Sequence, residues 1–190
     1  MVRIKPMYYV PRMVLHGRRI VVSVVFLALV SCTRPGPEPI AAFLKDRPAA
    51  TFVFLAPDCP LSQNYVPTLN ELRAQFQANQ MEIYAVFAGD ARPEEFVSSY
   101  QLTLPVIKDT AFRIADFFGA TTTPEAFVAD SKGQVLYKGA IDNRAPELGQ
   151  QRRVITEHYL LDALNSTLHH TDIAVKETKA VGCFIERTKG

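Results

Sequence analysis

The sequence lacks a basic face, an internal repeat and an apolar run long enough to cross a bilayer. Its 21 Lys and Arg against 19 Asp and Glu give a net charge of +2, but residues 1–31 hold five of the bases and no acid. The other 16 bases face 19 acids, so the body of the protein is mildly acidic and does not show the charge pattern of a nucleic-acid-binding protein. The longest apolar run, residues 20–30, is shorter than the roughly 20 residues of a transmembrane helix.

The basic and apolar N-terminus instead predicts a leader peptide. Arg18 and Arg19 precede the apolar run, which has the length of a signal-peptide core. The run ends in Leu29-Val-Ser-Cys32, which resembles the lipobox of bacterial lipoproteins, where the cysteine receives the lipid and becomes the new N-terminus. We therefore expect residues 1–31 to be a lipoprotein-type signal peptide. Lipid on Cys32 would hold the protein on a membrane, at its periplasmic or extracytoplasmic face.

Two other interpretations of the leader stay open: an uncleaved N-terminal anchor and an ordinary secretory signal. The stretch before Arg18 is unusually long, so Met1 and Met13 are both candidate start positions. After the leader, a segment rich in Pro and Gly follows, and residues 32–44 are expected to form a tether.

Cys59 lies at the junction of an apolar strand, expected at residues 51–56, and an amphipathic helix from 60 to about 78. This order puts Cys59 at the helix N-cap and Pro60 at the first helical position, where a missing N–H costs nothing. Unpaired backbone N–H groups and the positive end of the helix dipole favour a thiolate there. The pattern indicates a reactive cysteine; the alternative is a small, buried apolar one.

The rest of the chain alternates strands and helices. Further strands are expected at 81–88, 104–108, 126–129 and 134–139, and further helices at 93–100, at 111–118 and over about fifteen residues ending near Leu168, with a short helix or strand at 40–45. This order predicts an α/β fold with a central mixed β-sheet flanked by helices on both faces. The expected domain covers residues 45–170, and a tail, 171–190, carries Cys183.

These features resemble the thioredoxin-like superfamily, in its redoxin branch related to the AhpC/TSA peroxiredoxins. The resemblance rests on Cys59 at the strand-to-helix turn, on Pro67 inside the helix and on Thr123-Pro124. In that family the Thr-Pro bond is cis and packs beside the active cysteine, and the segment 93–108 corresponds to a redoxin-type insertion. The resemblance implies a thiol-dependent oxidoreductase with Cys59 as the nucleophile.

Three positions depart from the family pattern. Ser62 stands where thioredoxins have the second cysteine, so a disulfide within the motif is impossible; Ser62 either donates a hydrogen bond to the Cys59 thiolate or is an ordinary helix N-terminal serine. Val53 replaces the buried acid of thioredoxins. Ala56 replaces the hydroxyl residue that helps peroxiredoxins hold peroxide, which argues against efficient peroxide reduction.

Cys183 is the remaining thiol if Cys32 carries lipid. Cys59 and Cys183 would then form a structural disulfide or act as an attacking and a resolving thiol, and both interpretations require proximity. The tail is long enough to bring Cys183 back across the domain. Gly182 would allow a tight turn, and Val181 and Phe184 are expected to dock on apolar surface near the active edge. In the other case Cys183 lies elsewhere and an external thiol resolves Cys59.

The expected function is therefore thiol-disulfide exchange by a lipid-anchored protein, with Cys59 attacking a protein disulfide and Cys183 resolving the mixed disulfide. The alternatives are a thiol peroxidase and a non-enzymatic binding module in which the two cysteines form a permanent staple. The expected partners are a protein thiol or disulfide, or peroxide, together with an external redox partner and the membrane. No cofactor, metal or nucleic acid is expected.

Other polar residues carry weaker patterns. His169-His170 lack a Cys or carboxylate at metal-ligand spacing and are expected to be solvated at a helix end. Asp142-Asn-Arg144 is expected to be an ordinary exposed turn, the alternative being a guanidinium near the active face. Glu157-His158 is expected on the surface of the last helix.

Overall fold

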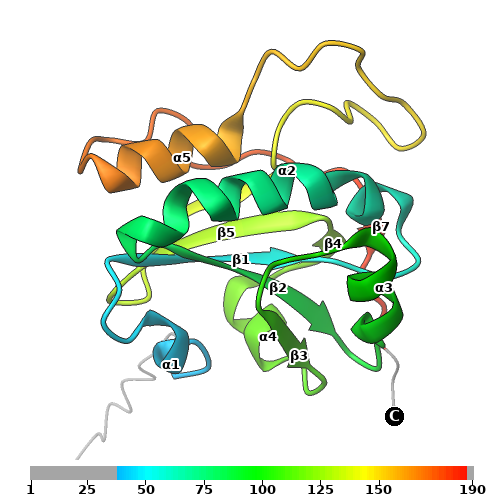
Figure 1. Cartoon of the computed structure of the whole chain (residues 1–190), viewed down its shortest axis with the longest axis horizontal. Coiled ribbons are helices and arrows are strands. Elements are labelled where there is room, and N and C mark those ends of the chain that lie inside the picture. The colour runs from blue at the N-terminus through cyan, green and yellow to red at the C-terminus, as the bar shows by residue number, and fades with distance from the viewer. Residues whose placement is uncertain (1–37, 188–190) are drawn as a thin grey trace, which may run out of the picture. The chain divides into compact units, whose positions relative to one another are not determined.

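A computed structural model describes residues 38–187, which build a five-stranded mixed sheet with helices on both faces (Figure 1). The strand order is β3-β2-β1-β5-β6, with β1, β2 and β3 parallel and β5 and β6 antiparallel. The strands are β1 (Ala49–Phe54), β2 (Glu82–Ala88), β3 (Val106–Asp109), β5 (Glu125–Asp130) and β6 (Val135–Gly139). The expected fold class is confirmed.

Alternation along the strands gives the sheet two apolar faces, because successive side chains point to opposite sides. In β1, Val53 faces one core, and Phe52 and Phe54 face the other. Helices α2 (Pro60–Phe76), α3 (Pro93–Tyr100) and α5 (Tyr159–Leu168) pack on the Val53 side, and α1 (Ala41–Leu44) and α4 (Arg113–Phe118) on the Phe52 side. Figure 1 shows α2 and α5 together above the sheet and α4 below it.

Helix α2 positions the site at its N-terminus. Its buried side chains fall at spacings of three and four, as in Tyr65, Leu69 and Leu72, so one face of the helix is anchored on the sheet. Pro67 lies inside the helix, as the sequence predicts. A short 3-10 segment, Gln77–Asn79, follows the end of α2.

The last helix is shorter than expected. α5 has 10 residues, and the segment before it forms a long loop, residues 140–158. Hydrogen bonds from the Asn143 amide to the Thr156 hydroxyl (2.8 Å) and from the Asn143 N–H to the Glu157 carbonyl (3.2 Å) hold that loop in place of helical bonds. Glu157 and His158 are exposed, as expected, but they precede the helix, and His158 is its N-cap.

The sequence analysis did not predict two short strands. β4 (Thr122–Thr123) and β7 (Cys183–Phe184) pair antiparallel in a sheet of their own. The tail therefore returns to the folded body and pairs with the residues just before Pro124.

The packed body also begins earlier than residue 45, because Ile40 and Leu44 of α1 are buried in the core on the Phe52 side. The leader, Cys32 and the start of the expected tether lie outside the described residues. Among residues 38–187, no helix has the length and apolar character needed to cross a membrane.

Candidate active site

Cys59 caps the N-terminus of α2. Strand β1 ends at Phe54, a turn closes with the Cys59 N–H bonded to the Ala56 carbonyl (3.2 Å), and Pro60 begins the helix. The expected N-cap geometry is present: Cys59 has φ −87° and ψ 113°, in the extended region typical of that position. Cys59 has 0% of its surface exposed. The cysteine is thus both at the helix end and fully buried.

Ser62 lies beside the sulfur, one turn into α2. It is fully buried, and its hydroxyl accepts a hydrogen bond from the Ala56 N–H at 3.2 Å. Both its backbone N–H and its hydroxyl are placed to bond to Cys59 and lower the pKa of the thiol. The hydrogen bond from Ser62 to a Cys59 thiolate stays a prediction.

Thr123 and Pro124 form the opposite side of the site. Their peptide bond is cis, as the family resemblance implied. The Cys59 thiol donates a hydrogen bond to the Thr123 carbonyl at 3.1 Å. The contact joins the first turn of α2 to β4, 64 positions further along the chain.

Cys183 reaches this site through the pairing of β7 with β4, in which Cys183 lies opposite Thr123. The Thr123 hydroxyl donates to the Cys183 carbonyl at 3.3 Å. The two cysteines are both free thiols here, and hydrogen bonding from the Cys183 thiol and backbone lowers the pKa of Cys59. The structure therefore brings together Cys59, Ser62, Thr123, Pro124 and Cys183.

Gly182 makes that approach possible, for a reason different from the expected tight turn. A Cβ at this position would lie 2.0 Å from the Thr123 carbonyl oxygen and 3.2 Å from Pro124 Cδ. Because real Cβ atoms do not come within 3.0 Å of such atoms, only glycine lets the tail lie this close to the Thr123-Pro124 bond.

The surroundings shift the pKa values of the two thiols in opposite directions. Burial raises the pKa of Cys59, but hydrogen bonds from Cys183 and Ser62 outweigh it and bring the pKa below the ordinary value of a thiol. Burial, the hydrogen bond with Cys59 and the charges of Cys59 and Asp58 raise the pKa of Cys183 to about 12. The site thus favours ionisation of Cys59 and disfavours ionisation of Cys183.

The tail is attached to the body along its length. The Thr178 hydroxyl accepts from the Ala140 N–H (2.9 Å) and bonds to the Tyr137 hydroxyl (2.8 Å), and Lys138 exchanges backbone bonds with Lys176 and Thr178. Beyond Cys183, the Ile185 N–H donates to the Thr121 carbonyl at 2.9 Å. These bonds fix the position of Cys183.

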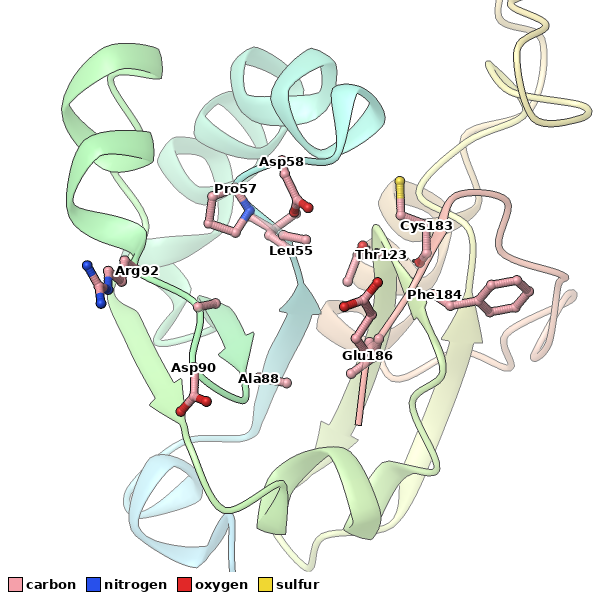
Figure 2. A pocket seen from close by; sticks show the side chains of 13 residues that line it. Leu55, Pro57, Asp58, Ala88, Asp90, Arg92, Thr123, Cys183, Phe184 and Glu186 are labelled. Carbon is pink, nitrogen blue, oxygen red and sulfur yellow. Dashed lines mark hydrogen bonds between the residues drawn. The ribbon is translucent and has the colours of Figure 1, made fainter. Parts of the chain in front are cut away.

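A pocket of about 560 Å³ opens beside Cys183 (Figure 2). The β1–α2 turn with Asp58, the β2–α3 turn with Asp90 and Arg92, and the tail with Glu186 form its walls. In Figure 2, Asp58 and Cys183 lie on facing walls, and the Phe184 ring points away from the pocket. Phe184 is 81% exposed, so its expected docking on apolar surface is wrong.

The Asp142–Arg144 turn differs from its expectation. Asp142 is buried and accepts a hydrogen bond from the Tyr65 hydroxyl at 2.5 Å. The Arg144 guanidinium lies 4.5 Å from the centre of the Tyr65 ring and donates to the Asn64 carbonyl at 3.0 Å. The turn therefore packs against α2, because the buried Asp142 carboxylate binds both the Tyr65 hydroxyl and the Arg144 guanidinium.

The other candidate ligands do not form a site in residues 38–187. His169 and His170 are exposed at the end of α5. No group of three or more His, Cys, Asp or Glu side chains in this part of the chain is arranged to hold a metal ion. The pocket and the carboxylate of Asp58 beside Cys183 were missed by the sequence analysis, since only the β4–β7 pairing brings them together.

Comparison with known proteins gives a family match and several relatives. The model of the AhpC/TSA family matches residues 40–138. The thiol-disulfide oxidoreductase ResA of Geobacillus thermodenitrificans is 29% identical over 79 residues, 40% of this chain and 45% of that protein. ResA of Bacillus thuringiensis is 27% identical over 100 residues, 52% of this chain and 58% of that protein. The chain thus spans about half the length of these curated relatives.

Two solved structures share the fold over most of the chain. A hypothetical protein from Sinorhizobium meliloti has a TM-score of 0.67 and 26% identity, covering 78% of this chain and 85% of that one. An uncharacterised conserved protein from Geobacillus kaustophilus has a TM-score of 0.65 and 20% identity, covering 75% and 78%.

Proposed function

Because the chain belongs to the AhpC/TSA family, we propose that it is a thiol-disulfide oxidoreductase in which Cys59 and Cys183 cycle between a dithiol and a disulfide. The observation that carries the proposal is the pairing of β7 with β4, which holds the Cys183 thiol against Cys59. The printed names of the ResA relatives describe the same class of activity.

The lowered pKa of Cys59 and the raised pKa of Cys183 suit this cycle. The pKa of Cys59 is lowered because hydrogen bonds from Cys183 and Ser62 overcome the effect of burial, so the thiolate, the reactive form in disulfide exchange, is favoured. Formation of the Cys59–Cys183 bond releases two electrons and two protons, and a partner disulfide accepts them to become two thiols. The stabilised Cys59 thiolate lowers the free energy of the reduced form and makes the disulfide more oxidising.

Two alternatives predict different results for the same protein. A thiol peroxidase requires peroxide at Cys59, but this sulfur is fully buried and Ala56 provides no hydroxyl beside it. A non-enzymatic module would keep the two cysteines permanently linked. The missing hydroxyl argues against efficient peroxide reduction.

Turnover assays separate these functions. The full-length protein is expected to catalyse thiol-disulfide exchange on a model protein disulfide and to reduce hydrogen peroxide no faster than a free thiol does. Cys59→Ser and Cys183→Ser are each expected to abolish exchange, and Cys32→Ser, the matched control that removes the third cysteine, is expected to retain it. Rapid peroxide turnover by the wild type would favour the peroxidase, and absence of both activities would favour the staple.

We further propose that Cys32 carries a lipid that holds the mature protein at an extracytoplasmic membrane face. The support is the sequence Leu29-Val-Ser-Cys32 directly after an apolar run of signal-peptide length. Mass spectrometry of the mature protein should find Cys32 as a lipid-modified N-terminus, and Cys32→Ser should leave an unprocessed or released form. An unmodified mature N-terminus elsewhere would contradict the proposal.

A further inference from the structure

We propose that the external thiol or disulfide exchanges with Cys183, from the pocket between Asp58 and Glu186, and that Cys59 is the buried sulfur that leaves and resolves. This inference rests on the thiol-disulfide function proposed above. It reverses the order expected from the sequence, in which Cys59 meets the partner first and Cys183 acts second.

Access separates the two sulfurs. Cys59 has 0% of its surface exposed, whereas Cys183 is partly exposed and lines the pocket. Because Cys59 is fully buried, an outside sulfur could reach it only after local opening of the site. Attack at Cys183 needs no such opening.

The pKa values of the two thiols also favour attack at Cys183. In disulfide exchange the thiol of lower pKa is the better leaving group. Burial, the hydrogen bond with Cys59 and nearby negative charge raise the pKa of Cys183 to about 12, whereas hydrogen bonds to Cys59 outweigh burial and lower the pKa of that thiol. Attack on Cys183 therefore expels the better leaving group, and attack on Cys59 would expel the poorer one.

The steps balance as follows. An incoming thiolate attacks Cys183 Sγ of the disulfide, the Cys59–Cys183 bond breaks, and its electron pair stays on Cys59 as a thiolate, held by Ser62. A second thiolate then attacks the incoming sulfur of the mixed disulfide and forms the product disulfide. Cys183 leaves and takes a proton, so two external thiols are oxidised and one protein disulfide is reduced. In the reverse direction, Cys59 resolves a mixed disulfide on Cys183.

The charge of the pocket selects among incoming thiols. Asp58, Asp90 and Glu186 line it against a single base, Arg92. Asp58 is close enough to Cys183 to raise the pKa of the thiol by its charge. The pocket therefore favours a thiol that carries positive charge, such as a cysteine with basic neighbours in a partner protein.

Mapping of the mixed disulfide tests the order of the sulfurs. The full-length oxidised protein is mixed with excess cysteamine, quenched with acid within the first turnover, and digested without reduction. We expect cysteamine on the Cys183 peptide and Cys59 as a free thiol. Cysteamine on the Cys59 peptide would overturn the inference and leave the proposed function intact. An oxidised protein without any Cys59–Cys183 linked peptide would overturn both.

Thiols of different charge test the pocket. At equal thiolate concentration, cysteamine should reduce the disulfide about fivefold faster than the neutral 2-mercaptoethanol, the effect of about one unit charge at contact distance in water. Asp58→Asn should narrow this ratio, and Glu147→Gln, which removes a carboxylate on the 140–158 loop, should leave it unchanged. An equal rate for the two thiols in the wild type would contradict entry through this pocket.

Discussion

Helix α2 and the C-terminal tail each deliver one sulfur to the site, but they are held by different forces. Seven residues of α2 are buried, and Leu69 is fully enclosed in the core on the Val53 side of the sheet. In the tail, residues 171–187, no side chain is buried. Its attachments are hydrogen bonds such as those of Thr178, the Lys138–Glu177 ion pair, close backbone contacts at Gly139 and Gly182, and the partly buried side chains of Ile173 and Ile185.

The difference implies different local stabilities. Apolar burial ties α2 to global folding, whereas a segment without a fully buried side chain opens at a lower free energy than the global one. We therefore expect Cys59 to stay in place until the body unfolds, and Cys183 to move when the tail opens locally. Four predictions test this contrast, from the largest expected effect to the smallest.

Leu69→Ala should cause the largest loss of stability. Truncation of a fully buried leucine leaves a cavity and typically costs about 2–5 kcal/mol. The measurement is the free energy of unfolding by urea. Leu148→Ala, at a leucine that is 69% exposed on the 140–158 loop, is the matched control and should change it by no more than about 0.5 kcal/mol. Equal losses for the two variants would contradict the assignment of the core.

Gly182→Ala should release the tail without unfolding the body. The new Cβ would overlap the Thr123 carbonyl, and such an overlap typically costs about 1–3 kcal/mol, so alkylation of Cys59 should accelerate about tenfold or more. Circular dichroism should show the body still folded.

Gly149→Ala is the control for backbone strain without a clash, because Gly149 has φ +82° but a Cβ there meets no atom within 4 Å. If Cys59 reacted no faster in Gly182→Ala than in Gly149→Ala, the close contact of the tail with Thr123 would not govern access to the site.

Cys183→Ala should raise the pKa of Cys59. Burial already pushes this pKa upward, and the Cys183 thiol supplies the strongest of the hydrogen bonds that lower it. The thiolate, followed by its ultraviolet absorbance against pH, should therefore form at higher pH in the variant. Cys183→Ser retains a hydroxyl donor and should show a smaller rise; a fall in either variant would be inconsistent with a hydrogen bond between the two side chains.

Phe184→Ala should have the smallest effect on stability. The ring is 81% exposed and points away from the pocket (Figure 2), so the free energy of unfolding should change by no more than about 0.5 kcal/mol. A loss comparable to that of Leu69→Ala would show that the tail, too, is held by apolar burial.

The local half of the site could be predicted from the sequence. The position of Cys59 at the N-cap and of Pro60 at the first helical position follows from an apolar strand that leads directly into an amphipathic helix. The cis bond at Thr123-Pro124 came from the family resemblance. These features depend on neighbouring residues or on a short motif, and both are visible in one sequence.

The non-local half could not be predicted in the same way. β4 and β7 have two residues each, too few to show a periodic pattern, so their pairing was not predicted, and the proximity of Cys183 to Cys59 was a hypothesis based on elimination and chain length. The role of Gly182 depends on a carbonyl 59 positions earlier in the chain. The helical residues expected before Tyr159 do not form a helix, because hydrogen bonds between the side chain of Asn143 and Thr156 compete with the backbone hydrogen bonds of a helix.

A redox titration of the full-length protein tests the central claim most directly. The protein is equilibrated in glutathione buffers of increasing potential, quenched with acid and mapped without reduction. The account predicts that the Cys59–Cys183 linked peptide appears and disappears reversibly, along a single transition with the slope of a two-electron couple. A pair that stays linked in every buffer, or that never links in any, would contradict it.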